Sequence, residues 1–143
     1  EELLYQCFNR TLEVEGLLLN DADSEHTSGL RKVELSLRYL FNIQFSEEGP
    51  LIRYRALPSL DEEHRKDILR ATKDNNKVLG TYIKQGLGDG TLRKTDVDIA
   101  QNVLSGAVEA SPDLAEWMED TRGPELSAAY FHLFINGLSR RQK

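Results

Sequence analysis

The chain has very little cysteine and no long hydrophobic run. Its 143 residues include a single cysteine, so no disulfide can form within it, which suits a reducing cytosol. No apolar stretch approaches the roughly 18 residues of a membrane-spanning helix. The first residues carry too many charges for a secretory signal peptide. We therefore expect a cytoplasmic protein that has no membrane partner.

Positive charge and catalytic motifs are also scarce. The chain has 18 Lys and Arg against 24 Asp and Glu, for a net charge of -6. Phosphate contacts need clustered Lys and Arg, so this composition argues against nucleic-acid binding by the chain alone. The three histidines lack the Glu-x-x-His spacing of a di-iron bundle, and no nucleophile-elbow sequence occurs. We expect no enzyme, no metal site and no cofactor.

Helical periodicity is what the sequence does contain. Apolar residues recur at helical spacing and no segment alternates convincingly with period two, which predicts an all-α bundle of about six to seven helices. The length suits one domain, residues 1–143, with a sizeable core. The pattern of residues 25–45 is apolar on two sides, as is typical of a central helix. The expected helices cover residues 1–20, 25–45, 50–57, 59–87, 95–110, 111–122 and 125–140.

Polar residues and prolines mark the expected helix starts. Ser59 followed by Glu62 has the spacing of a capping box, so we expect Ser59 to cap the long helix. Pro50 fits the first turn of a short helical segment. Ser111 and Pro112 together predict the start of a new short helix, with Ser111 as its cap.

The segment Gly86–Gly90 admits two readings. Its glycines suggest a phosphate-binding loop, but that motif needs a preceding strand and the spacing G-x-G-x-x-G. A helix precedes this segment and its spacing differs. We therefore favour the end of a helix followed by a tight turn, with Gly86 and Gly88 stopping the helix.

Cys7 lies on the expected apolar face of the first helix. Beside Phe8, it is interpreted as a small core residue rather than a reactive thiol, which would need cationic neighbours. The inward stripe expected for this helix contains Leu4, Cys7, Phe8, Thr11, Val14 and Leu18.

Two arginines flank a tyrosine in the short segment before the long helix. Arg53 and Arg55 can extend their charged ends from a surface helix into solvent, which is the simpler reading. Alternatively, an arginine here anchors a ligand at the mouth of an apolar cavity. Such a cavity would take an amphipathic or anionic molecule.

The expected helices over 95–110 and 125–140 carry more apolar and small residues than one buried face needs. A second apolar face suggests a symmetric helical interface, so we favour a homodimer over a monomer. The predicted interface residues are Ala100, Val103, Leu104, Ala107, Phe131, Phe134, Ile135 and Leu138.

Three stretches resemble the tetracycline-repressor (TetR) family of bacterial transcription regulators. Glu1–Phe8 resembles the start of the helix that links the family's DNA-binding head to its regulatory domain. Tyr82–Arg93, followed by Asp96–Ala100, is similar to the end of its long helix, a glycine turn and the start of a dimer helix. Phe134–Leu138 is similar to the closing dimer helix. The stretches occur in the family's order and span nearly the whole chain.

The resemblance implies an effector-binding and dimerisation domain of a ligand-responsive regulator, acting as a repressor. The family's helix-turn-helix would lie upstream of residue 1, so operator DNA would be bound only through that head. The last long helices would pair two protomers in a four-helix interface. A small hydrophobic or amphipathic effector would enter a cavity between the linking and middle helices and alter operator affinity.

Helix positions then predict the residues around that cavity. The expected polar anchor is Arg53, and the expected walls are Phe8, Leu37, Phe41, Tyr54, Tyr82 and Trp117. Two other functions remain open at this point: a dimeric helical interaction module without a ligand, and a small helical enzyme. An enclosed cavity would favour the regulator, whereas a solid core would favour the interaction module.

Overall fold

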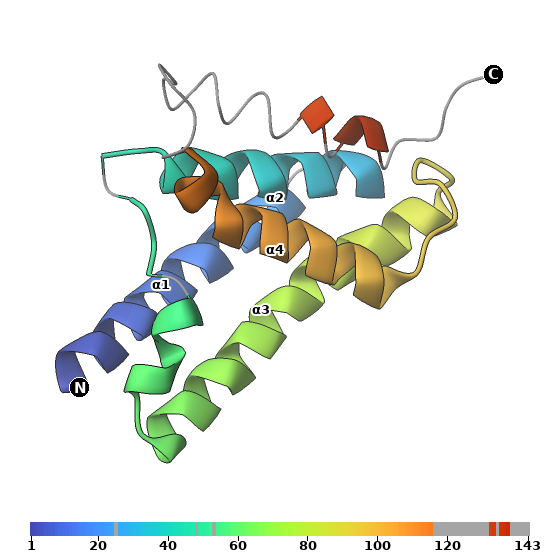
Figure 1. The fold of residues 1–143 in the computed structure, drawn as a ribbon. Coiled ribbons are helices and arrows are strands. Elements are labelled where there is room, and N and C mark those ends of the chain that lie inside the picture. The colour runs from blue at the N-terminus through green and yellow to red at the C-terminus, as the bar shows by residue number, and fades with distance from the viewer. Residues whose placement is uncertain (25, 48, 53, 116–131, 134, 138–143) are drawn as a thin grey trace.

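The protein folds as an all-α bundle, as the sequence predicts (Figure 1). A computed structural model describes residues 1–24, 26–47, 49–52, 54–115, 132–133 and 135–137. Among them, no helix is both long and apolar enough to cross a bilayer. The described elements are α1 (Glu2–Asp21), η1 (Ala22–Ser24), α2 (Gly29–Gln44), η2 (Tyr54–Ser59), α3 (Glu62–Gly88) and α4 (Val97–Ala115), η denoting a 3-10 helix.

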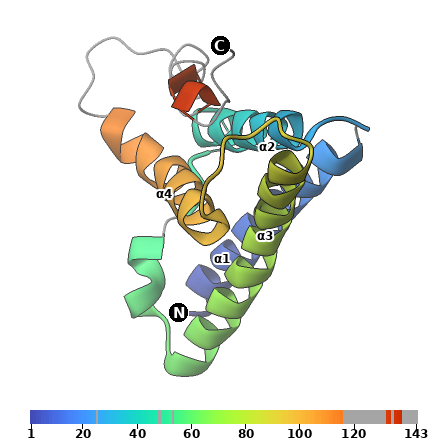
Figure 2. The same cartoon turned by 90° about the vertical axis from the view of Figure 1, so that its right-hand side faces the viewer.

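Helix α2 is the centre of the bundle. Helices α1 and α3 run side by side, α2 lies across their C-terminal parts, and α4 packs on α2 and α3 (Figures 1 and 2). On one side of α2, Val33, Leu37 and Phe41 are 0% exposed and Leu40 is also buried. On the opposite side Leu35 is buried and Tyr39 packs partly buried against the same core. The two-sided apolar pattern therefore predicted the central helix correctly.

Two hydrophobic clusters form the core. The first, called here the α2 cluster, joins α2 to its neighbours. It contains Leu19, Ala22, Val33, Leu35, Leu37, Leu40, Phe41, Leu79, Tyr82, Ile83, Leu92, Ala100, Leu104, Val108 and Ile135. The second, called here the η2 cluster, lies where η2 packs between the N-terminal parts of α1 and α3. It contains Phe8, Leu12, Leu57, Leu60 and Ile68.

The expected orientation of α1 is wrong by about one position. Cys7, expected in the core, is exposed. The inward positions instead follow Phe8, Leu12, Glu15 and Leu19, an i, i+4, i+7, i+11 series. Phe8 and Thr11 of the expected stripe are buried, whereas Val14 is half-buried. The buried face is therefore rotated toward Leu12 and Leu19 and keeps part of the predicted stripe.

Helix α3 begins two residues later than expected. Ser59 ends η2 and does not cap α3; the cap is Asp61, whose Oδ1 accepts the N–H of His64 at 2.8 Å. Leu60, between the two, is buried in the η2 cluster. Asp is as good an N-cap as Ser, so burial of the intervening leucine decides the boundary. Pro50 lies outside η2, and the expected helical first turn there is also absent.

Helix α4 continues through the position where a new helix was expected. Ser111 and Pro112 both lie inside α4, so Ser111 is not an N-cap. Proline lacks the N–H that would bond to Val108, four residues back. The Ser111 hydroxyl donates to the Val108 carbonyl oxygen at 2.8 Å instead. This side-chain bond satisfies the carbonyl and lets the helix pass through the proline.

The glycine segment at the end of α3 packs against the start of α2. Gly86 is helical rather than a helix stop, and a Cβ on Gly29 would lie 2.0 Å from the Gly86 nitrogen. Past the end of α3, Asp89 accepts the Gly29 N–H at 2.8 Å and Thr91 Oγ1 accepts the Leu30 N–H at 3.2 Å. Gly90 takes φ 77° in the turn. The segment is thus a turn that caps α2.

Candidate functional site: an acidic cavity between the helices

A cavity of about 50 Å³ lies between the two hydrophobic clusters, where α1, α2, η2, α3 and α4 meet. One water needs roughly 10–15 Å³ by this measure, so the cavity holds a group of a few heavy atoms. Larger ligands require the lining elements to move apart. The lining residues are Glu15, Leu19, Leu40, Gln44, Tyr54, Asn75, Asn76, Leu79, Ser105, Val108 and Glu109.

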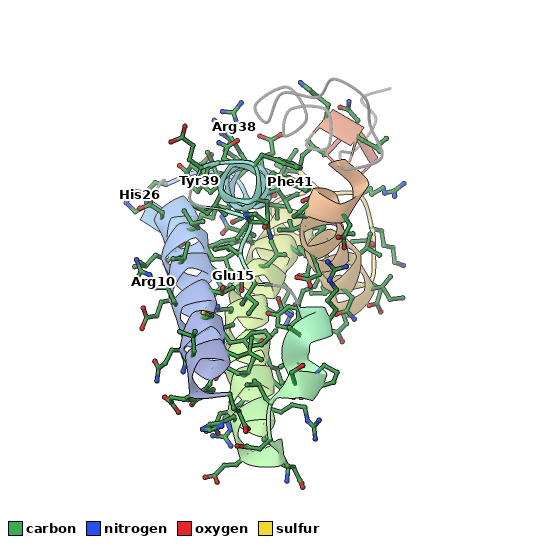
Figure 3. The ribbon with its side chains drawn as sticks, turned by 60° about the vertical axis from the view of Figure 1, so that its left-hand side comes forward. Arg10, Glu15, His26, Arg38, Tyr39 and Phe41 are labelled. Atoms are coloured by element: carbon green, nitrogen blue, oxygen red, sulfur yellow. The ribbon has the colours of Figure 1, made fainter. Side chains whose placement is uncertain are left out.

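Glu15 brings a carboxyl group into this space from α1. It is directed between the helices, whereas Arg10 of the same helix points outward (Figure 3). Burial and, to a smaller extent, the charge of Glu109 raise the pKa of Glu15 to about 7, although a side-chain hydrogen bond with Asn75 opposes the rise. The carboxyl group therefore titrates near neutral pH.

Glu109 of α4 faces the cavity and holds the start of η2. Its Oε1 accepts the N–H of Tyr54 at 2.6 Å. The Tyr54 hydroxyl lies 3.0 Å from Thr72 Oγ1. Burial raises the pKa of Tyr54 above its usual value, as do the charges of Glu15 and Glu109. Tyr54 thus stays protonated and offers a hydrogen-bond donor.

Side-chain amides and one hydroxyl complete the polar lining, and each is held by a hydrogen bond. Asn75 Nδ2 donates to the Leu12 carbonyl oxygen at 2.9 Å. Ser105 Oγ donates to Asn76 Oδ1 at 3.2 Å. Gln44 Oε1 accepts the N–H of Leu51 at 3.1 Å. These bonds fix the orientation of the polar groups before any ligand enters.

Of the predicted cavity residues, the structure places Tyr54 at the cavity. Phe8 belongs to the η2 cluster, and Leu37, Phe41 and Tyr82 to the α2 cluster, and none of these four lines this cavity. The Tyr82 hydroxyl donates to the Leu19 carbonyl oxygen at 2.8 Å. Arg53 and Trp117 lie outside the described residues.

Sequence reasoning missed the polar residues of the cavity, above all Glu15, Asn75 and Glu109. A signal was present in α3, where Thr72 and Asn76 interrupt an otherwise apolar stripe. Polar residues at core-facing positions mark a place where the core is not closed.

The predicted interface residues fall into three groups. Ala100, Leu104 and Ile135 are buried within their own chain, while Ala107 is half-buried and Val103 is 55% exposed. Phe131, Phe134 and Leu138 lie outside the described residues. Two further apolar residues, Ile99 and Leu133, are exposed and line one surface groove together with Val103. The interface assignment stays a prediction, now centred on this groove.

Another group of titratable side chains lies at the start of α3. Ligand atoms of Glu1, Asp61 and His64 lie within 4.8 Å of one another, close enough to share a metal ion. Their contacts also have a structural explanation: Asp61 caps α3, and the Glu1 carboxylate accepts the Asp61 N–H at 2.7 Å. The His64 ring lies 4.1 Å from that of Tyr5. We assign this group to the packing of α1 on α3.

Comparison with known proteins identifies the fold. No protein-family model matches the sequence, and no curated protein matches it either. Among solved structures, a TetR-family regulatory protein from Rhodococcus matches 99% of this chain and 75% of its own, with TM-score 0.80 and 16% identity. The ketosteroid transcriptional regulator KstR2 of Mycobacterium tuberculosis matches 99% and 74%, with TM-score 0.82 and 15% identity.

A third similar structure is that of AibR in complex with isovaleryl coenzyme A and operator DNA. It matches 92% of this chain and 72% of its own, with TM-score 0.72 and 14% identity. The chain therefore has the fold of TetR-type transcription regulators over nearly its whole length, as the sequence resemblance predicts. These similar structures are regulators rather than enzymes.

Proposed function

We propose that this chain is the effector-binding and dimerisation domain of a TetR-family transcription regulator that acts as a repressor. The observation that carries the proposal is the cavity at the meeting point of the four long helices that the structure describes, in a chain with the fold of such regulators. AibR, a protein of this fold, has been solved with both a small molecule and operator DNA, which supports the same pairing of roles here.

Helix α1 provides a physical link between the cavity and DNA. It lines the cavity with Glu15 and Leu19, and its N-terminal end lies at the opposite end of the molecule from α2 (Figure 1). We propose that a helix-turn-helix head precedes Glu1 in the complete gene product. A ligand that fits one tilt of α1 better than another then changes the separation of two heads, which must match about one DNA turn.

The proposed homodimer uses the groove of Ile99, Val103 and Leu133. Val103→Glu introduces a charge at its centre and should yield monomers in light scattering, where the unchanged chain is a dimer. Leu69→Glu is the matched control, because Leu69 is 50% exposed on α3 and Val103 is 55% exposed on α4. A dimeric V103E protein would refute this interface.

The regulatory role is tested with the complete gene product and DNA from upstream of its own gene. Fluorescence anisotropy should show specific binding that V103E weakens and L69E retains, because a dimeric operator needs two heads. Absence of specific binding would refute the regulator.

The small size of the cavity favours one other candidate, a dimeric interaction module without a ligand. That candidate predicts a dimer that neither binds DNA nor responds to small molecules.

A further inference from the structure

We infer that the strap, defined here as residues 49–60, is a movable door through which ligands reach the cavity. The strap joins α2 to α3 and contains η2, and the structure describes residues 49–52 and 54–60 of it. This inference rests on the proposed function and adds the route by which an effector enters. The reasons are the packing of the strap, the bonds that hold it and the position of Tyr54.

The strap can move with less loss of packing than the helices around the cavity. The cavity holds only a few heavy atoms, so a larger ligand needs one lining element to move. The four long helices are joined by the α2 cluster, whereas the strap contributes Leu57 and Leu60 to the η2 cluster. In Figures 1 and 2, η2 lies beside the N-terminal parts of α1 and α3, at the other end of these helices from α2. Moving the strap therefore exposes less apolar surface than moving a helix and leaves the α2 cluster intact.

Two N–H groups of the strap before η2 donate to side chains of the neighbouring helices. The Leu51 N–H donates to Gln44 Oε1 of α2 at 3.1 Å, and the Ile52 N–H donates to Thr11 Oγ1 of α1 at 3.3 Å. Gln44 also lines the cavity. Water can replace side-chain acceptors of this kind one at a time, whereas a helix loses its backbone bonds cooperatively. The strap can thus separate from α1 and α2 without unwinding either helix.

Side chains of α4 hold the start of η2 in the same manner. The Tyr54 N–H donates to Glu109 Oε1 at 2.6 Å, and Arg55 forms an ion pair with Asp113 at 3.3 Å. The Arg55 side chain is 66% exposed, so solvent weakens this pair. Side chains of α1, α2 and α4 therefore hold the strap closed together, and their bonds to it must break when it opens.

Tyr54 separates the cavity from the η2 cluster. Its side chain lines the cavity and also packs against the η2 cluster, with its ring centroid 6.4 Å from that of Phe8. Its hydroxyl lies 3.0 Å from Thr72 Oγ1 of α3, which orients the ring in the closed position. Because Tyr54 belongs to η2, outward movement of the strap withdraws this ring. The cavity then gains the volume of the ring and an opening to solvent.

The opposite end of α2 provides a matched reference. There the Gly29 N–H donates to Asp89 Oδ2 at 2.8 Å and the Leu30 N–H donates to Thr91 Oγ1 at 3.2 Å, again from backbone to side chain. At this end, however, the two helices touch, because a Cβ on Gly29 would overlap the Gly86 nitrogen. Close packing of this kind leaves no room for water, so we expect these bonds to stay closed. Comparing the two sites separates the type of bond from the mobility of the element.

The first test measures access to the cavity in the complete gene product. Val108→Cys places a thiol in the cavity lining, where Val108 is 6% exposed, and the probe is methyl methanethiolsulfonate. Peptide mass spectrometry follows the labelling of residue 108. Thr11→Val removes the acceptor of the Ile52 N–H and should speed this labelling about tenfold. Thr91→Val removes the acceptor of the Leu30 N–H at the reference site and should change the rate by less than about twofold.

Hydrogen exchange provides a second measurement, on the unaltered protein. After correction for intrinsic rates, the amides of Leu51, Ile52 and Tyr54 should exchange at least about tenfold faster than those of Gly29 and Leu30, because the strap opens while the helices stay packed. This measurement decides the question even if a variant fails to fold.

Several outcomes would overturn the inference. These are equal exchange of the two sets of amides, no faster labelling in T11V, equally faster labelling in T11V and T91V, or a thiol at residue 108 that already reacts as fast as a free thiol. The outcomes separate the two proposals. A door in a gene product that never binds its upstream DNA would refute the regulator alone, whereas specific DNA binding with labelling unchanged by T11V would refute the door alone.

Discussion

The α2 cluster and the acidic cavity are neighbours built from the same helices, yet they are filled very differently. In the α2 cluster, Val33, Leu37 and Phe41 leave no exposed surface. In the cavity, Glu15 of α1 and Glu109 of α4 both line a space of about 50 Å³. Close packing stabilises the fold, whereas facing carboxylates oppose it. The difference indicates that the packing around α2 stabilises the bundle, whereas the burial of Glu15 at the cavity lowers its stability.

The largest expected effect is loss of packing in the α2 cluster. Phe41→Ala removes a ring that is 0% exposed and should lower the free energy of unfolding by about 3–5 kcal/mol. Urea unfolding followed by circular dichroism measures this loss. A loss below about 1 kcal/mol would show that α2 is not the main source of stability.

A substitution in the cavity should instead raise the free energy of unfolding. At pH 8, Glu15→Gln removes a buried charge and should raise the free energy of unfolding by up to about 3 kcal/mol. The carboxyl group loses its proton near pH 4.5 when unfolded but near pH 7 when folded. The folded state therefore binds more protons between these values, and wild-type stability falls as the pH rises through that window.

Below pH 4.5 the advantage of E15Q should disappear, because Glu15 is then protonated in both states. Glu13→Gln alters an exposed pair with Arg10 and should change stability by less than about 1 kcal/mol at either pH. If E15Q were no more stable than wild type at pH 8, the carboxyl group would not be under electrostatic strain.

The smallest expected effect checks which face of α1 is buried. Cys7 is exposed, so Cys7→Ser should change stability by no more than about 0.5 kcal/mol. In the folded wild-type protein the thiol should react with Ellman's reagent at a rate close to that of the unfolded chain. A protected thiol would show that Cys7 is buried, as the sequence predicted, and that Glu15 does not face the cavity.

Sequence reasoning worked where one kind of side chain dominates a helix face. The two apolar sides of α2 predicted a central helix, and the order of three short stretches predicted the TetR-like fold. It failed where a polar side chain takes a core-facing position. On α1, Glu15 lines the cavity while Cys7, expected in the core, is exposed, and a hydrogen bond from Ser111 lets α4 continue through Pro112.

The cavity itself could not be predicted for a related reason. Its acids come from positions 94 residues apart in the sequence, Glu15 and Glu109, and only the crossing of α1 and α4 over α3 brings them together. Periodicity describes each helix separately, whereas a site shared by several helices depends on how they pack. Within a single helix, the signal of this site was the pair of polar residues Thr72 and Asn76 in the apolar stripe of α3.

The measurement that tests the account most directly is the affinity of the complete gene product for DNA upstream of its own gene, compared between the wild-type protein, V103E and L69E. The account predicts specific DNA binding that V103E weakens and L69E retains, because a dimeric operator needs two heads. Absence of specific binding, or equal binding by all three proteins, would contradict a dimeric regulator.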